Sequence, residues 1–352
     1  MDGKIKMCNR GFHACESPFD VFDYYTMIDS RFCEVEQDGN ISKEDRGTKI
    51  CSSKIKIKAE LKLAGMINLG VEWLKEITSP EKIKTSIKDN SSGNYAKIGS
   101  SDDEAQIGSS GYGAQIGSSG YGAKIGSSGY GAKIGSSGYG AKIGSSGNNA
   151  QIGSSGNNAQ IGSSGYEAKI GSSGNDAQIG SSGNNAQIGS SGNNAQIGSS
   201  GYGVKIGSSG NNAQIGSSGN NAQIGSSGYE AKIGSSGNDA QIGSSGNNAQ
   251  IGSSGDGAQI GSSSDGAKIS SSGYGAKIDS TGEDCVIMCA GINSVAKASK
   301  GSWVTLSEWS YSEEKQRYIP ICVKTEFVDG EKIKADTYYS LKGGVFVEWI
   351  ND

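Results

Sequence analysis

Residues 144–152 read Gly-Ser-Ser-Gly-Asn-Asn-Ala-Gln-Ile, and close variants of this nonapeptide fill the middle of the 352-residue chain. An isoleucine stands at every ninth position from Ile98 to Ile287 without a change of register. A repeat this short cannot bury its own apolar face, so neighbouring repeats must stack around a shared core. The pattern therefore predicts a β-solenoid.

Each nonapeptide is expected to supply one short strand and one turn. Ala-Gln-Ile predicts a three-residue strand in which Ala and Ile point inward. The other six residues are turn formers that tolerate positive φ. Two nonapeptides then form one coil with two narrow parallel sheets, and a triangular coil of three is the alternative. The small Ala favours the two-sheet coil, which gives about eleven coils.

The expected fold is therefore dominated by β structure. We predict an α+β N-terminal module and cap over residues 1–90, a nonapeptide-repeat solenoid over residues 91–290, and a β-meander cap over residues 291–352. Caps are expected because an open solenoid end exposes unpaired strands. The predicted core column is represented by Ile98, Ile107, Ile152, Ile188, Ile224, Ile260 and Ile287.

The repeat period is shared with calcium-binding nonapeptides, in which an aspartate precedes the large aliphatic residue by two positions. When the repeats are aligned on Ile152, Ala150 occupies the position of that aspartate. Without the carboxylate the turn cannot form an oxygen cage for a hard cation. We therefore expect a metal-independent solenoid without a cofactor.

Four tyrosines follow one another at the first variable position of the repeat, namely Tyr112, Tyr121, Tyr130 and Tyr139. In a two-nonapeptide coil they form two stacked pairs, Tyr112 with Tyr130 and Tyr121 with Tyr139. They are candidates for a partner-binding stripe. Block copying is the other explanation, because residues 144–188 recur unchanged at residues 207–251.

The N-terminal region shows three local patterns. Ser17-Pro18 predicts the start of a short helix. Residues 54–63 alternate as a strand, with Lys54, Lys56 and Lys58 on the polar face as a candidate surface for an acidic partner. Residues 69–77 predict a short amphipathic helix that covers the first coil.

The only histidine, His13, lies between Cys8 and Cys15. A zinc site would need Cys33 or Cys51 from a distance, and a catalytic Cys–His pair is a further alternative. A packed structural turn explains the segment most simply, and His13 is retained as a candidate interaction residue.

The C-terminal region predicts strands over residues 303–309, 317–328, 331–341 and 345–350. Asp329-Gly330 is a typical two-residue hairpin turn, and Gly343-Gly344 predicts another reversal. These strands are expected to form one small meander that seals the solenoid.

Composition and charge limit the function classes. The net charge is −4 and is spread along the chain, so binding to nucleic acid by charge is disfavoured. No apolar run is long enough to span a membrane. An odd number of cysteines, seven, and no signal peptide favour free thiols and a cytoplasmic location, the host cytoplasm if a phage encodes the chain.

The chain resembles a family of phage and gut-bacterial proteins with a Gly-Phe-His-Ala-Cys motif in an N-terminal domain of unknown function. Matching segments are Gly11-Phe12-His13-Ala14-Cys15, Pro18, Asp20-Val21-Phe22, Tyr24-Tyr25, Cys33-Glu34-Val35-Glu36, Ser53-Lys54-Ile55-Lys56-Ile57 and Lys300-Gly301-Ser302-Trp303. Such proteins commonly continue into nonapeptides of this type. The resemblance implies a phage or prophage setting and an N-terminal domain that begins before Met1, but no biochemical activity.

These observations favour a non-enzymatic, rod-like structural or interaction protein with a protein partner whose identity is open. It would act inside the host, for example by sequestering or occluding a host or defence factor, and its end modules could also mediate oligomerisation. Two alternatives remain open. The N-terminal module could be a degenerate ADP-ribosyltransferase-like enzyme, or the rod could mimic or bind nucleic acid.

Overall fold

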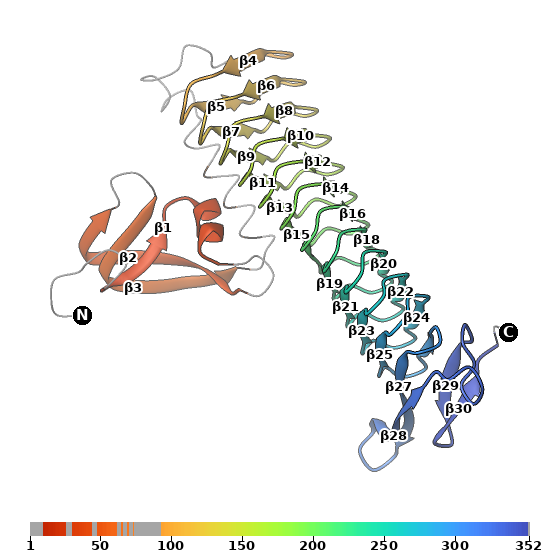
Figure 1. Ribbon diagram of the computed structural model, residues 1–352. Coiled ribbons are helices and arrows are strands. Elements are labelled where there is room, and N and C mark those ends of the chain that lie inside the picture. The colour runs from red at the N-terminus through yellow and green to blue at the C-terminus, as the bar shows by residue number, and fades with distance from the viewer. Residues whose placement is uncertain are drawn as a thin grey trace. The chain divides into compact units, whose positions relative to one another are not determined.

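The computed structural model describes residues 10–25, 30–43, 48–61 and 93–350, together with Gly65, Leu69 and Trp73. It divides into two compact units, residues 1–186 with 198–200 and residues 187–197 with 201–352. The repeats form a β-solenoid of about 12 stacked coils (Figure 1). The predicted fold class is confirmed.

In the first unit, the solenoid strands belong to two parallel sheets. The first sheet contains β4 (Lys97–Ser100), β6 (Gln115–Ser118), β8 (Lys133–Ser136), β10 (Gln151–Ser154) and β12 (Lys169–Ser172). The second sheet contains β5 (Gln106–Ser109), β7 (Lys124–Ser127), β9 (Lys142–Ser145), β11 (Gln160–Ser163) and β13 (Gln178–Ser181).

In the second unit, the first sheet contains β14 (Gln187–Ser190), β16 (Lys205–Ser208), β18 (Gln223–Ser226), β20 (Gln241–Ser244), β22 (Gln259–Ser262), β24 (Lys277–Ser280) and β26 (Val295–Lys297). The second sheet contains β15 (Gln196–Ser199), β17 (Gln214–Ser217), β19 (Lys232–Ser235), β21 (Gln250–Ser253), β23 (Lys268–Ser271) and β25 (Val286–Cys289).

The strand register shows how many repeats form one coil. Ile152 pairs with Ile170 on one side and with Ile134 on the other, so neighbouring strands of a sheet lie two nonapeptides apart. This confirms the two-nonapeptide coil. All predicted core isoleucines are buried: Ile98, Ile107, Ile152, Ile188, Ile224, Ile260 and Ile287.

The strand phase differs from the prediction. From β4 to β22, each strand comprises Gln or Lys, then Ile, Gly and Ser, whereas the sequence suggested Ala-Gln-Ile with Gly-Ser-Ser in the turn. Because the pleat alternates, Ile152 and Ser154 point inward and Gly153 points outward. Ala150 is fully buried just before the strand. The solenoid core is therefore lined by the Ala, Ile and Ser side chains of the repeats.

Backbone geometry limits which residue types can occupy two of the turn positions. A Cβ atom on Gly147 would lie 1.9 Å from the carbonyl oxygen of Gly129 in the preceding coil, so a side chain has no room there. Asn149, at the second variable position, has a φ of 56°. This left-handed conformation favours Gly, Asn and Asp.

The described N-terminal region contains a small antiparallel sheet in the order β1 (Phe12–Cys15), β3 (Lys49–Leu61) and β2 (Phe32–Lys43). The helix after Ser17 is a 3₁₀ helix, η1 (Pro18–Asp23). β3 confirms the predicted strand but begins earlier. His13 lies in β1, so the structural turn expected there is wrong.

Of the helix predicted over residues 69–77, only Leu69 and Trp73 lie within the described residues, and both are helical. The predicted packing of this helix against the first coil therefore lies outside the described residues.

The C-terminal region consists of two hairpins that extend different sheets. β27 (Trp303–Ser312) and β28 (Arg317–Phe327) continue the second sheet after β25, while β29 (Tyr339–Lys342) and β30 (Val345–Glu348) continue the first sheet after β26. The single predicted meander is therefore wrong. Residues 328–338 contain no strand, and Asp329 accepts hydrogen bonds from the amides of Glu331 and Ile333 there instead of starting a hairpin.

The reversal at Gly343-Gly344 is confirmed, with both φ angles positive. It joins β29 to β30.

No helix in the described residues is long and apolar enough to cross a membrane.

Candidate interaction surfaces

The clustered tyrosines stack as the repeat period predicts. The rings of Tyr112 and Tyr130 are 5.5 Å apart with an interplanar angle of 4°, and those of Tyr121 and Tyr139 are 5.5 Å apart at 6°. All four rings are about half exposed. The pairs therefore lie on the surface, where they also stabilise neighbouring coils.

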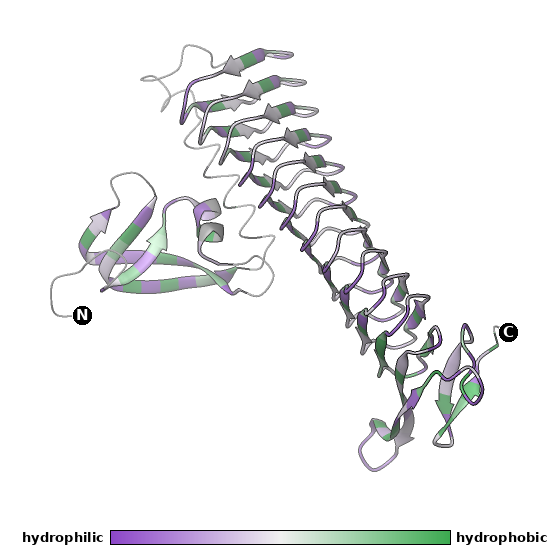
Figure 2. Cartoon of the chain, in the orientation of Figure 1, coloured by the Kyte–Doolittle hydropathy of each residue, from purple (hydrophilic) through white to green (hydrophobic). Residues whose placement is uncertain are grey.

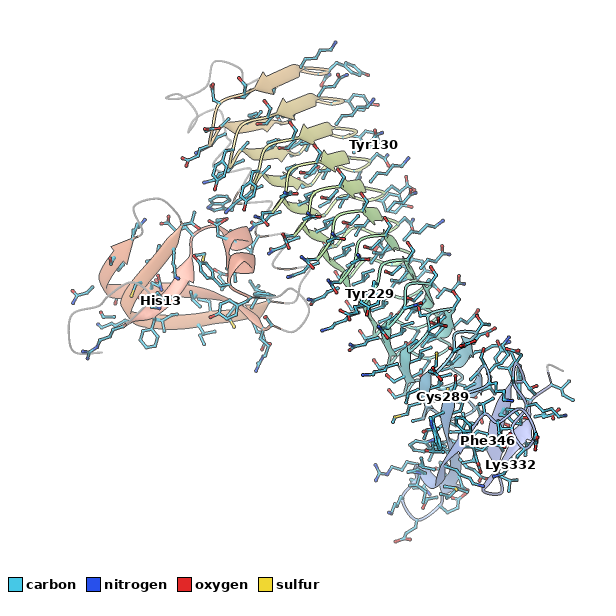
Figure 3. The ribbon with its side chains drawn as sticks, viewed as in Figure 1. His13, Tyr130, Tyr229, Cys289, Lys332 and Phe346 are labelled. Carbon is cyan, nitrogen blue, oxygen red and sulfur yellow. The ribbon has the colours of Figure 1, made fainter. Side chains whose placement is uncertain are left out.

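The tyrosine hydroxyls have partners within the solenoid. Six tyrosine hydroxyls, among them those of Tyr130 and Tyr229, accept a hydrogen bond from an asparagine 19 residues later, at the left-handed turn position of the next coil on the same edge. Figure 3 shows the side chains of Tyr130 and Tyr229 on the solenoid. The pairs are Tyr130–Asn149, Tyr139–Asn158, Tyr166–Asn185, Tyr202–Asn221, Tyr229–Asn248 and Tyr274–Asn293. The tyrosines thus have a structural role whether or not they also contact a partner.

The lysine face of β3 is exposed and partly neutralised. Lys58 lies 3.4 Å from Glu36, and Lys54 lies 3.9 Å from Asp38, both on the neighbouring strand β2. Lys56 is also exposed, and Glu36 is its cross-strand neighbour. Two of the three predicted residues are therefore already paired with carboxylates of the same sheet.

His13 is exposed on β1 opposite Cys51 of β3. It lines an open hollow of about 1670 Å³ together with Cys15, Cys33 and Tyr24. Cys8, the other end of the motif, lies outside the described residues. Within the residues that can be described, no group of three or more His, Cys, Asp and Glu side chains could hold a metal ion.

The outer faces of the two sheets differ in the first unit. At the third strand position, the second-sheet glycines Gly108, Gly126, Gly144, Gly162 and Gly180 are buried. The equivalent glycines of the first sheet are exposed or half-exposed, and a Cβ atom there would meet nothing within 4 Å: Gly99, Gly117, Gly135, Gly153 and Gly171. We call these, with Gly189, Gly207, Gly225, Gly243 and Gly261 of the second unit, the glycine column.

N-terminal residues contact the covered face of the second sheet. Asp20 of η1 accepts hydrogen bonds from Ser17 and Thr48 and forms an ion pair with Lys142 of β9. The Lys124 ammonium lies 5.6 Å from the centre of the Trp73 ring. This sheet face therefore already has partners within the chain.

The last strands of the first sheet are covered by the C-terminal region. The Lys277 ammonium lies 4.4 Å from the ring centre of Tyr338 and 5.0 Å from that of Trp349. The Tyr338 hydroxyl donates to Asp279, which also pairs with Lys297. Burial, with a smaller effect of the Asp279 charge, raises the pKa of Tyr338 to about 12. Here larger residues, Asp279 and Lys297, replace the outward glycine.

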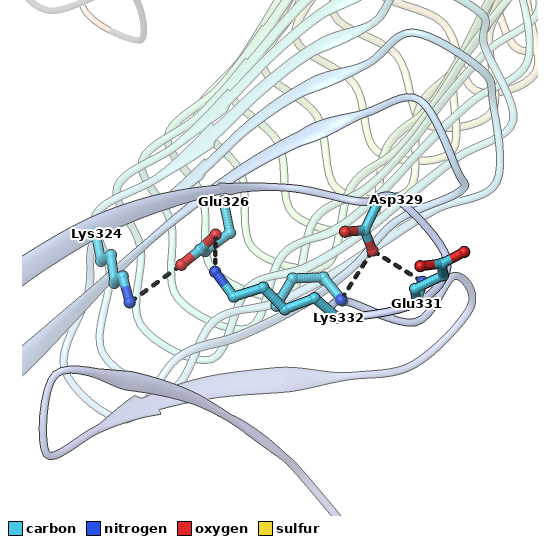
Figure 4. A network of polar contacts seen from close by, with 6 residues as sticks. Lys324, Glu326, Asp329, Glu331 and Lys332 are labelled. Carbon is cyan, nitrogen blue, oxygen red and sulfur yellow. Dashed lines mark hydrogen bonds and ion pairs between the residues drawn. The ribbon is translucent and has the colours of Figure 1, made fainter.

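A polar network joins β28 to the loop that follows it (Figure 4). Glu326 lies 3.0 Å from Lys324 and 2.8 Å from Lys332, and hydrogen bonds from these lysines lower the pKa of its carboxyl. Backbone amides of Glu331 and Ile333 lower the pKa of Asp329 in the same way. The network fixes the loop and leaves the opposite face of β28 free of charge.

The sequence did not identify the glycine column as a surface, because Gly-Ser-Ser-Gly looks like a turn. The available signal was the strict separation of Ile and Gly by one position, which places them on opposite faces of a strand.

The comparisons concern the N-terminal domain. A family model described as a domain of unknown function, DUF7666, matches residues 1–69. Neither the curated proteins nor the solved structures gave a match to this chain. The match spans the sheet of β1, β2 and β3 with η1. The chain therefore carries an N-terminal DUF7666 domain followed by a β-solenoid of repeats.

Proposed function

We propose that the chain is a non-enzymatic interaction protein of a phage or prophage whose solenoid binds a protein inside the host cell. The proposed binding surface is the outer face of the first sheet. The glycine column carries this proposal, because no contact within the chain requires glycine at its positions, and in the first unit the equivalent second-sheet glycines are buried instead.

An outward glycine in a strand is unfavourable by roughly 0.5–1 kcal/mol relative to alanine. On the second sheet of the first unit, contacts with other residues offset this cost, because Gly108 and Gly126 are buried there. The same glycines on the first sheet leave the backbone open for close approach. A partner that packs on this flat face would account for them.

The side chains beside the glycine column suggest the chemistry of the partner. In the first unit, Lys97, Lys133 and Lys169 alternate with Gln115 and Gln151 along the sheet. Successive lysines are therefore two strands, or about 9.6 Å, apart. This charge density is too low to neutralise a run of phosphates. It suits a protein surface that offers carboxylates at this interval together with small side chains.

A capture experiment with matched variants tests the proposal. The full chain is compared with Gly225→Glu/Gly243→Glu on the first sheet and with Gly234→Glu/Gly252→Glu on the second sheet of the same coils. Every one of these positions has room for a side chain, so both variants should fold. A host protein should bind the wild type and the second-sheet variant in stoichiometric amount, and the first-sheet variant should lose it.

Equal binding by both variants would contradict the proposed face. Capture of a nucleotide through the N-terminal domain would favour the transferase-like alternative, and capture of nucleic acid would favour the mimic or binder.

A further inference from the structure

The outward residues of the second sheet change character at the end of the solenoid. At the first strand position, Gln250 and Lys268 are followed by Val286, and at the third position Gly252 and Ser270 are followed by Met288. Val286 is 51% and Met288 50% exposed, so neither is placed in the core. The polar surface of the repeats thus gives way to an apolar one.

The apolar surface continues along the register of the sheet. Val286 pairs with Trp303, and Trp303 pairs with Phe327, whose ring centre is 5.1 Å away. Val323, on the same face of β28, is 63% exposed. β25, with the sequence Val-Ile-Met-Cys, is hydrophobic throughout (Figure 2). A contiguous exposed patch of this kind marks a contact surface.

This patch ends at an open sheet edge. β28 is the last strand of the second sheet, and within the described residues β27 is its only neighbour. It is 11 residues long, and Pro320 is its only proline. Residues 321–327 therefore offer unpaired backbone groups beside exposed apolar side chains, a template for pairing with another strand.

We propose that β28 pairs with β28 of a second copy of this chain, antiparallel across a twofold axis at Thr325. In such a pair, the residue on the axis faces itself and residues equally distant from it face each other. Centring on Thr325 places Lys324 opposite Glu326 of the second copy and Val323 opposite Phe327.

Charge selects this register. A pair centred one residue earlier places Lys324 opposite itself, and one residue later places Glu326 opposite itself; both arrangements oppose like charges. The register at Thr325 brings two opposite-charge pairs and two apolar pairs together. It also joins the Trp303–Phe327 row of one copy to Val323 of the other.

Disulfide trapping tests the axis directly. Thr325→Cys should form a crosslinked dimer under mild oxidation, because directly opposed residues lie within disulfide reach. Thr305→Cys, on the neighbouring inner strand, is the matched control and should give no dimer linked through residue 305. Mass spectrometry of the linked peptides identifies the bond. No link through residue 325, or equal links in both variants, would overturn the proposal.

Sedimentation of the unmodified protein provides an independent measurement. The 36.1 kDa chain should show a reversible dimer over a broad concentration range. Val323→Glu should weaken dimerisation at least about tenfold. Val345→Glu, at another exposed valine, on β30, should leave it unchanged. A wild type that stays monomeric, or a loss with Val345→Glu alone, would contradict pairing through β28.

Lys324→Glu should also weaken the dimer, and Lys324→Glu/Glu326→Lys should restore it, because the reversed pair is again complementary. Circular dichroism checks that each variant is folded. Failure of the double variant to recover, with its fold intact, would rule out the register at Thr325.

Discussion

The hydroxyl of Tyr229 accepts a hydrogen bond of 2.7 Å from the side-chain amide of Asn248, one coil further along the same edge. Asn248 has a φ of 60°, so its backbone also occupies the left-handed region. The residue therefore has two structural roles, which substitutions can separate.

Asn248→Ala should destabilise the protein by about 1–2 kcal/mol, because alanine disfavours left-handed backbone. Asn248→Gly should change stability by no more than about 0.5 kcal/mol, since the exposed hydrogen bond contributes little and glycine adopts this φ freely. Denaturant unfolding of both variants measures the difference. Equal losses would show that the hydrogen bond dominates.

Gly147→Ala should destabilise the solenoid by about 2 kcal/mol or more, because the new methyl group would meet the carbonyl of Gly129 in the preceding coil. Gly153→Ala is the control. Its methyl group would point into open space on the first sheet, and its effect should lie between no change and a gain of about 1 kcal/mol. Thermal melting distinguishes the two, and a reversed order would contradict the turn geometry.

Ile188→Asp should be severely destabilising, by about 3 kcal/mol or more, because it buries a carboxylate among apolar side chains. Gln187→Asp, one residue earlier but exposed, should change stability by about 0.5 kcal/mol or less. Melting temperatures of the two variants provide the measurement. Similar values would mean that the strand phase is wrong.

Stability should fall as the pH rises from about 9 towards 12. Burial raises the pKa of the Cys289 thiol from 9.0 to about 12, against a smaller lowering by Ser294. The unfolded chain therefore loses this proton first, and deprotonation favours unfolding by up to about 4 kcal/mol at the upper end. Cys289→Ala should show a smaller fall than the wild type in denaturant unfolding at pH 8 to 11. If the stability of both proteins falls equally with pH, the Cys289 thiol is not the cause of the fall.

Metal removal should leave the solenoid folded. Ala150 and its equivalents occupy the positions of the carboxylate ligands in calcium-binding nonapeptides. Melting with and without excess chelator should therefore agree within a few degrees. A larger loss in chelator would show that a metal ion contributes to the fold.

The sequence predicted the parts of the fold that repeat. One isoleucine per nonapeptide identified the buried column, and the period of two nonapeptides placed Tyr112 above Tyr130. The strand boundaries were missed because glycine and serine are turn formers by propensity. In the solenoid, stacking overrides that propensity, so Gly153 and Ser154 are paired as a strand.

The C-terminal region could not be predicted in the same way. Asp329-Gly330 has the composition of a hairpin turn, but β28 and β29 belong to different sheets. β28 follows β27 onto the sheet of β25, whereas β29 pairs with β26, and all of β27 and β28 lies between those two strands in the sequence. The contact between Asp20 and Lys142, 122 residues apart, has no local signal either.

Because successive nonapeptides alternate between the two sheets, the parity of the repeat number determines surface chemistry. Gain or loss of a single nonapeptide would transfer every later repeat residue to the opposite sheet. Gain or loss of two nonapeptides would leave each residue in its original sheet. Replication slippage in the repeated gene segment would thus exchange faces whenever it adds one unit. The copy of residues 144–188 at residues 207–251 lies seven nonapeptides further on and shows such an exchange, because Gln151 lies in the first sheet and its counterpart Gln214 in the second.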